Sequence, residues 1–221
     1  MSVGKIIVKE PGSAITHFIG SAMALVAAVP LLIRGAAAPG YNTMISFAIF
    51  IASMFMLYTA STVYHTFDLS SKINLLLKKF DHMSIYVLIA GSYTPICIVV
   101  LKGKTGMGML AVIWSMALLG IFFTLFFVNC PKWLSSVIYI VMGWTCIFAL
   151  GKIVAALQGP AFYWLLAGGV IYTVGGVIYA LKLPLFNSRH KNFGSHEIFH
   201  LFCLGGSLCH FVLMYSFVSF M

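Results

Sequence analysis

Long apolar runs follow one another along the chain, separated by short polar or helix-breaking segments. Each run is close to the ~20 residues that an α-helix needs to cross the hydrocarbon core of a bilayer. The runs lie near residues 14–34, 43–66, 81–101, 107–128, 133–151, 160–182 and 196–219. Gly and Pro residues mark several of the breaks, and Ser195 is a suitable N-cap for the last helix. The pattern predicts an all-α protein, a bundle of seven transmembrane helices.

The composition agrees with lipid as the main solvent. Of the 221 residues, 62% are hydrophobic and 8% are charged, a balance that water-soluble domains do not show. Seven spans and six short connections use almost the whole chain, so we expect one domain over residues 1–221. The five cysteines form no C-x-x-C pair and lie mostly in apolar runs, which speaks against a disulfide framework. The polar start, with Lys5, Lys9 and Glu10, does not fit a signal peptide, so we expect the first run to be retained.

The net charge of +9 is better explained by membrane topology than by nucleic-acid binding. The basic residues occur in small groups between apolar runs, whereas a nucleic-acid site gathers them on one face or in one tract. If the N-terminus is cytoplasmic, the inner segments hold Lys5, Lys9, Lys72, Lys78, Lys79, Lys132, Lys182, Arg189 and Lys191. The outer segments then hold Arg34, Lys102, Lys104 and Lys152. This bias predicts an inner N-terminus and an outer C-terminus.

Small and helix-breaking residues predict features of the packing. The last two spans carry Gly168, Gly169, Gly175, Gly176, Gly205 and Gly206. Such residues let helix backbones approach closely in a membrane. Pro95, which follows Gly91 and Ser92, predicts a kink in the third span and a polar crevice beside it.

Ionisable side chains inside apolar runs are costly, and in membrane proteins they mark functional sites. Here they occur at the end of the second span and at the starts of the third and seventh spans. They are His65, Asp81, His82, His196, Glu197 and His200. The predicted topology places all of them near the cytoplasmic leaflet. Three segments far apart in the sequence therefore bring imidazoles and a carboxylate to one depth.

This set suits a zinc site. His196 and His200 are four residues apart, so on a helix they differ by about 40° in azimuth and about 6 Å in rise, and both rings can reach one ion. Catalytic zinc takes three protein ligands and a water, and His65 is the predicted third ligand. Ser61, one turn before His65, is placed to hydrogen-bond a ligand or the water. Asp81 is placed to accept a proton from the zinc-bound water.

Each of these residues also has a simpler interpretation. Interfacial histidines are often merely solvated, and Asp81 could cap the third helix. Glu197 could simply interact favourably with the helix dipole. His196 to His200 also matches the H-E-x-x-H motif, with Glu197 as the base. We favour this less, because Glu197 points about 100° away from His196 on an ideal helix.

The remaining histidines are not expected to be ligands. His17 and His82 lie at the same membrane face and would contribute polar packing around the site. His210 lies about 15 Å deeper than His200 on an ideal helix, too far for the same ion. His190 falls in a basic loop and is expected to be solvated.

Three motifs in order resemble the hemolysin III branch of the progestin and adiponectin receptor family. They are residues 61–65 (STVYH), residues 80–82 (FDH) leading to 91–95 (GSYTP), and residues 195–200 (SHEIFH). The wider superfamily includes alkaline ceramidases. The resemblance implies a buried zinc with His65, His196 and His200 as ligands, Asp81 on the zinc-bound water, and Ser61 in the second span. It also implies a bacterial inner membrane and a role in membrane homeostasis.

Two functions from different classes remain open. One is a zinc hydrolase of a lipid amide or ester, with the substrate entering from the bilayer. The other is a non-enzymatic sensor or regulator of membrane state with a structural zinc. Three histidines and a water favour catalysis, because structural zinc usually has four protein ligands. A pore is less favoured, because its polar residues would occupy successive depths.

Overall fold

The computed structural model describes residues 8–181 and 193–221, and these residues are almost entirely helical. The α-helices are α1 (Pro11–Ala37), α2 (Asn42–Thr66), α3 (Ser71–Pro95), α4 (Gly103–Phe127), α5 (Lys132–Gly143), α6 (Leu150–Ala156), α7 (Pro160–Leu181) and α8 (Ser195–Ser216). A π-helical segment, Ile96–Leu101, extends α3, and 3₁₀ segments Trp144–Ala149 and Val218–Phe220 follow α5 and α8. Lys182, Arg189, His190 and Lys191, which entered the sequence predictions, lie outside the described residues.

Within the described residues, seven helical stretches are long and apolar enough to cross a membrane. The fold class and the number of spans predicted from the apolar runs are therefore confirmed, and the chain is a multi-pass membrane protein. Three spans are composite, because α3 continues into the π-helical segment, α5 continues through a 3₁₀ segment into α6, and α8 continues into the 3₁₀ segment Val218–Phe220. The fifth span consequently reaches Ala156, five residues beyond the predicted end at 151.

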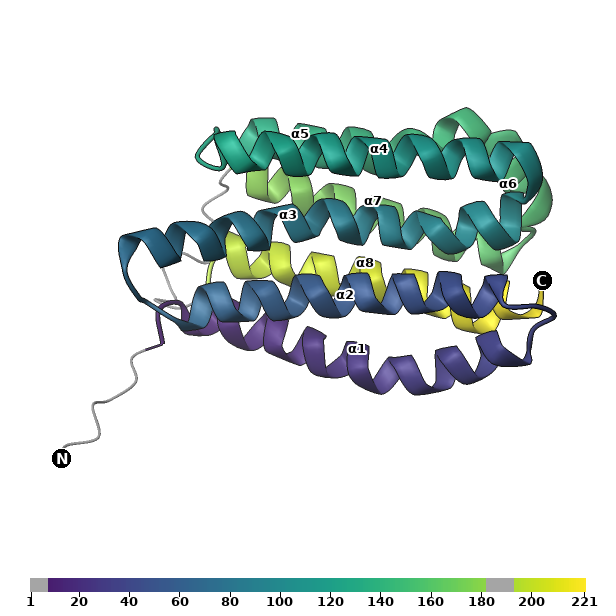
Figure 1. Ribbon diagram of the computed structural model, residues 1–221, viewed down its shortest axis with the longest axis horizontal. Coiled ribbons are helices and arrows are strands. Elements are labelled where there is room, and N and C mark those ends of the chain that lie inside the picture. The colour runs from purple at the N-terminus through teal and green to yellow at the C-terminus, as the bar shows by residue number, and fades with distance from the viewer. Residues whose placement is uncertain (1–7, 182–192) are drawn as a thin grey trace.

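The helices lie side by side along the long axis of the molecule (Figure 1). Helix α1 packs on α2 and α8, α2 on α3, α3 on α4, α5 on α7, and α7 on α8. Of the seven spans, the third is the most enclosed by its neighbours. Helix α1 begins at the end of the bundle opposite to the C-terminus (Figure 1), as an odd number of spans requires. Which end faces the cytoplasm stays a prediction.

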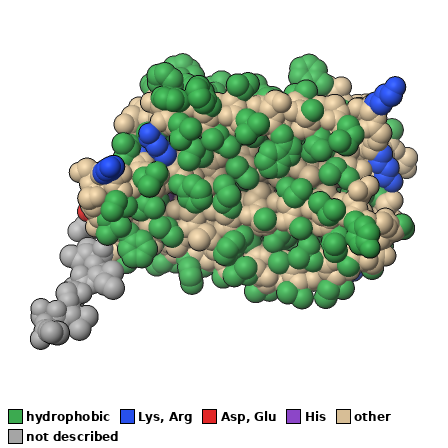
Figure 2. Space-filling model, in the orientation of Figure 1, with side chains coloured by type: hydrophobic (Ala, Val, Ile, Leu, Met, Phe, Trp, Pro, Cys, Tyr) green, Lys and Arg blue, Asp and Glu red, His purple; other side chains and the backbone are tan. Residues whose placement is uncertain are grey.

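The surface between the two ends is largely apolar. Figure 2 shows hydrophobic side chains spread over the middle of the visible face, with Lys and Arg side chains towards the two ends of the long axis. Many large hydrophobic residues are exposed, among them Phe18, Val26, Leu119 and Phe148. This arrangement matches a helical bundle whose outer surface contacts lipid chains.

The third helix begins ten residues earlier than predicted. It starts at Ser71, and Ser70 is its N-cap, with the Ser70 hydroxyl accepting a hydrogen bond from the Ile73 amide at 3.4 Å. Lys72, Lys78 and Lys79 lower the hydropathy of this first part without breaking the helix. Asp81 therefore lies inside α3, and the interpretation of Asp81 as a helix cap is wrong.

The N-terminus of α8 also differs from the prediction. Gly194 occupies the N-cap position, and Ser195 is the first helical residue. The Glu197 carboxylate accepts a hydrogen bond from the Gly194 amide at 2.8 Å, which satisfies one of the amides left free at a helix start.

Pro95 does not simply kink the third span. Because proline has no backbone N–H and its ring crowds the preceding turn, the helix widens into the π-helical segment Ile96–Leu101. The segment ends where the Lys102 amide donates to the Cys97 carbonyl at 3.1 Å, with Lys102 and Gly103 at positive φ. The residues just before Pro95 line a cavity described below.

Glycines allow α7 and α8 to pack closely, which the sequence predicts from six glycines in the last two spans. A Cβ atom on Gly168 would lie 2.4 Å from the His210 ring, and one on Gly175 would lie 2.6 Å from Phe202. A Cβ atom on Gly206 would lie 2.6 Å from Tyr172. A Cβ atom on Gly169, in contrast, would have no heavy atom of a neighbouring residue within 4 Å.

Candidate metal centre

Three histidines from two helices meet at the end of the bundle where α2 ends and α8 begins. His65 lies in the last turn of α2, and His196 and His200 lie in the first two turns of α8. One ring nitrogen from each can be chosen so that all three lie within 4.8 Å of one another. His65 and His200 are almost fully buried. The three residues that the sequence singles out as ligands are thus brought together.

The distances fit a small metal ion. Two ring nitrogens bound to one tetrahedral zinc at about 2.0–2.1 Å are about 3.3 Å apart, and Nε2 of His65 lies 3.4 Å from Nε2 of His196. The ring of His200 has its centroid 5.3 Å from that of His65 and 4.5 Å from that of His196. Without a metal, the same 3.4 Å contact allows a hydrogen bond between the His65 and His196 rings.

The outer nitrogen of His65 faces a carboxylate. Its Nδ1 contacts Oε2 of Glu10, which immediately precedes α1. The hydrogen bond from His65 lowers the pKa of the Glu10 carboxyl, so Glu10 is charged at neutral pH and His65 Nδ1 carries the proton. In the neutral ring that metal binding requires, the Nε2 atom of His65 keeps its lone pair and faces the other two histidines.

His200 is held in the same way by a hydroxyl. Its Nδ1 lies 3.0 Å from Oγ1 of Thr16 in α1. That hydroxyl can donate its only proton to the backbone carbonyl of Gly12 or of Ser13, at 3.0 and 2.9 Å. With the proton on one of these carbonyls, the Thr16 oxygen accepts from His200 Nδ1–H, and the lone pair of His200 is left on Nε2.

A small cavity joins two of the histidines to the predicted catalytic residues. It has a volume of about 30 Å³ and is lined by Ser61, Asp81, His196 and His200 among others. A water molecule needs about 10–15 Å³ of such space. The Ser61 hydroxyl is buried and has no hydrogen-bond partner among the described residues. Ser61 is thus available to a water or ligand inside this cavity.

The two acidic residues considered for the base occupy different settings. Asp81 is buried, lines the small cavity, and lies 3.1 Å from Nδ1 of His82. Glu197 accepts from the Ser13 hydroxyl at 2.5 Å and from the Gly194 amide. The first contact joins the start of α8 to α1, and the second caps α8 itself. Glu197 does not line the small cavity, so its local role is to cap the helix.

His17 and His210 lie outside the cluster of three histidines. His17 of α1 stacks on the His200 ring with a centroid distance of 3.6 Å, in keeping with its predicted packing role. His210 lies further along α8, beside Tyr172 and Gly168. His210 is not part of the three-histidine cluster, as the sequence predicts.

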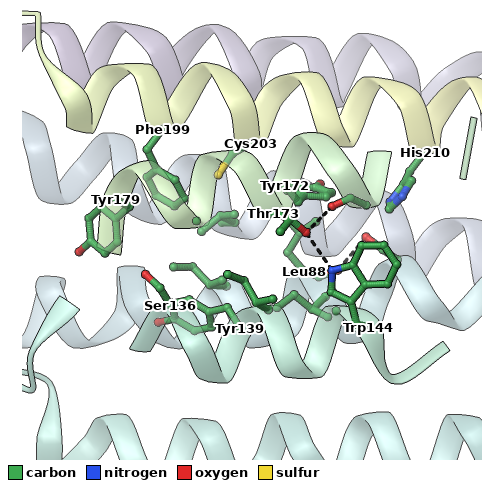
Figure 3. A pocket seen from close by; sticks show the side chains of 18 of the residues that line it. Leu88, Ser136, Tyr139, Trp144, Tyr172, Thr173, Tyr179, Phe199, Cys203 and His210 are labelled. Carbon is green, nitrogen blue, oxygen red and sulfur yellow. Dashed lines mark hydrogen bonds between the residues drawn. The ribbon is translucent and has the colours of Figure 1, made fainter. Parts of the chain in front are cut away.

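A second, larger cavity of about 120 Å³ lies between α3, α5, α7 and α8 (Figure 3). It shares Tyr139, Tyr179, Phe199 and Cys203 with the walls of the small cavity. Its walls are mostly apolar, and it extends as far as Trp144 and His210. Trp144 donates a hydrogen bond to Thr173 at 2.9 Å across it. The predicted polar crevice near Pro95 is therefore a largely apolar cavity with a few polar groups.

Glu10 and Thr16 are the parts of the centre that sequence reasoning missed. In the sequence Glu10 stands out only as part of a polar N-terminus, and nothing distinguishes Thr16 from other threonines. Both lie at the start of the first apolar run, where polar residues commonly serve as helix caps. Their spacing of six residues carries no metal-binding motif. The charge of Glu10, one of only four acidic residues in the chain, was the one available clue.

Comparison with known proteins relates the chain to the haemolysin III family. Residues 5–211 match the family model described as haemolysin-III related. Hemolysin-3 of Bacillus cereus is 38% identical over 209 residues, covering 94% of this chain and 91% of the relative. The hemolysin-3 homolog of Bacillus subtilis is 41% identical, covering 94% of each chain. An ADIPOR-like receptor, IZH2, of Saccharomyces cerevisiae is 34% identical over 80 residues, or 35% of this chain and 24% of the receptor.

Proposed function

This chain belongs to the haemolysin III family of membrane proteins, and we propose that it is a zinc-dependent hydrolase of a lipid amide or ester. The observation that carries the proposal is the convergence of three imidazoles, two of them with a partner on the outer nitrogen, beside a buried carboxylate. In the cell, such an activity would contribute to membrane lipid homeostasis. We place the protein in a bacterial inner membrane with its N-terminus in the cytoplasm.

The donor set suits zinc. His65, His196 and His200 would hold the ion through neutral imidazole nitrogens, the ligands that zinc accepts most readily in a catalytic site with three protein ligands. Two of these rings have their outer nitrogen occupied by Glu10 and Thr16, an arrangement typical of metal-bound histidine. When bound, zinc would supply a Lewis acid that activates water and polarises a carbonyl group.

Asp81 and Ser61 have the catalytic roles in this proposal. Asp81 would accept a proton at its carboxylate from a water molecule in the small cavity, which both residues line. The Ser61 hydroxyl, which has no partner among the described residues, would hydrogen-bond that water or the substrate carbonyl. We assign Ser61 a positioning role and not that of nucleophile, because a metal site needs no separate Ser-His-Asp arrangement.

The larger cavity fits the apolar part of a lipid. It begins next to the small cavity, at Tyr179 and Phe199, and continues between the helices with mainly apolar walls (Figure 3). A lipid with its ester or amide at the histidine centre would place its hydrocarbon chain there. No Lys, Arg, Asp or Glu lines this cavity in the described part of the chain, which favours an uncharged chain over a charged one.

A regulator of membrane state is the second candidate, and one observation favours it. The three histidines come from α2 and α8, and their two supporting residues are Thr16 of α1 and Glu10 just before it. A metal here would therefore fasten α2 to α8, at a point where both ligand helices are hydrogen-bonded to the start of α1. Helix packing could then respond to lipid order without any turnover. The open coordination position left by three histidines favours the hydrolase.

The substitution Asp81→Asn tests the hydrolase. It keeps the shape of the side chain and removes the proton acceptor, so activity should fall by about 10²- to 10⁴-fold while zinc content and fold are retained. The measurements are zinc analysis of purified protein, hydrolysis of lipid amides and esters, and lipid profiles of cells with and without the protein. Asp68→Asn is the matched control, because exposed Asp68 bonds only to Asn74 in the described structure.

Two results decide between the candidates. An Asp81→Asn protein with normal zinc and an undiminished effect on membrane lipids would exclude Asp81 as the base and favour the regulator. A protein that binds no zinc, with all three histidines intact, would exclude both.

A further inference from the structure

The segment just before α1 is fastened to the last turn of α2. The Lys9 amide donates to the Thr66 carbonyl at 3.1 Å, and the Glu10 amide donates to the His65 carbonyl at 2.9 Å. The Lys9 ammonium lies 4.0 Å from the centre of the Tyr64 ring. Backbone bonds therefore set the position of Glu10 beside His65, independently of the Glu10 side chain itself.

The Glu10 side chain adds a contact to the ring it lies beside. Its carboxylate meets Nδ1 of His65, on the side of the ring opposite the 3.4 Å contact between Nε2 of His65 and Nε2 of His196. A carboxylate in this place fixes the ring orientation and the position of the proton, and makes the free nitrogen a stronger ligand. Because it faces the outer nitrogen, Glu10 is not itself placed to bind the same ion.

We propose that Glu10 is a positioning residue of the metal centre, through which the N-terminal segment controls metal affinity. Glu10 holds His65 in the tautomer with Nδ1 protonated, so that Nε2 presents its lone pair to the ion. The segment is thus a part of the centre that joins α1 to the ligand from α2. This inference rests on the proposed function in so far as zinc is the bound ion.

Zinc affinity gives the first test. Zinc Kd would be measured on the purified full-length protein in detergent by competition with a chromophoric chelator. Glu10→Ala should weaken binding by about 10- to 100-fold, as loss of such a supporting group does elsewhere. Glu10→Gln should lose less zinc affinity than Glu10→Ala, because the Gln amide oxygen still accepts from His65 Nδ1–H. Asp68→Asn removes an acid in the nearby loop after α2 that contacts Asn74 and no ligand, and should leave Kd unchanged.

A metal-free measurement separates this inference from the proposed function. The ¹⁵N NMR signals of histidine, assigned to His65 by their loss in His65→Gln, report which ring nitrogen carries the proton. The metal-free wild type should show protonated Nδ1, and Glu10→Ala should shift the ring towards the other tautomer. An unchanged tautomer in Glu10→Ala, or a zinc Kd equal to that of wild type, would overturn the role of Glu10. A wild type with the expected tautomer that binds no zinc would overturn the proposed function, whereas the control of the His65 tautomer by Glu10 would stand.

Discussion

The surroundings of His200 and of His210, both on helix α8, differ. His200 has its Nδ1 on Thr16 and its ring among His17, His65 and His196. His210 also buries both ring nitrogens, but neither makes a hydrogen bond of good geometry to a described residue; the Leu165 carbonyl is the polar backbone group near its ring. Burial of an imidazole in a membrane bundle is therefore not enough to mark a metal site. Convergence from several helices and a partner on the outer nitrogen are the distinguishing features.

Removal of a ligand should give the largest effect. His65→Ala, His196→Ala or His200→Ala should each weaken zinc binding by more than about 100-fold, beyond the 10- to 100-fold range for supporting groups. His210→Ala should retain the metal. Metal analysis after purification checks both outcomes, and full zinc occupancy in a His196→Ala, His200→Ala double variant would refute the assignment.

The same variants should lose stability as well as metal. A ligand that binds only the folded state adds about 4 kcal/mol when its free concentration is about a thousand times Kd. Added zinc should therefore raise the Tm of the wild type and of His210→Ala in detergent, and leave that of His200→Ala unchanged.

The sequence predicts the spans and the meeting of His65 with His196 and His200, because both depend on local rules. Apolar length sets the number of crossings, and the spacing of four places two imidazoles on one helix face. The predicted depth of each span end then places the His65 ring at the same level of the membrane as these two rings. These arguments need no knowledge of which helices are neighbours.

Features that depend on neighbouring helices were not predictable in this way. The break at Trp144–Ala149 coincides with Tyr93 of α3, whose hydroxyl donates to the Gly143 carbonyl at 2.5 Å and accepts from the Cys146 amide at 2.8 Å. Nothing within the fifth span specifies such a partner. The same holds for Glu10 and Thr16, whose roles depend on how α1 packs against α2 and α8.

The partner of His200 should have a smaller effect than a ligand. Thr16→Val keeps the shape and removes the oxygen that accepts from Nδ1, so zinc Kd should rise by about tenfold. Thr16→Ser restores the oxygen and should bind nearly as well as the wild type. Chelator competition measures the three affinities. Weakened binding in the Ser variant together with wild-type affinity in the Val variant would show that packing of the Thr16 methyl group, and not the hydrogen bond, is what matters.

The smallest effect is expected at His210, and it concerns stability. Replacing a buried polar group that has no partner with an apolar one removes a desolvation cost, so His210→Leu should be neutral or stabilising by up to about 1 kcal/mol. In a chain of this size that corresponds to a rise in Tm of about 2–4 °C. His200→Leu, measured in the metal-free protein, should instead be destabilising, because it leaves the Thr16 oxygen without its donor. Gly168→Ala provides a control on the position of the ring, since its Cβ would lie 2.4 Å from the His210 ring. That substitution should destabilise the wild type and cost less in the His210→Leu background. A marked loss of Tm in His210→Leu would contradict the comparison, because it would show that His210, like His200, has a polar partner on which the fold depends.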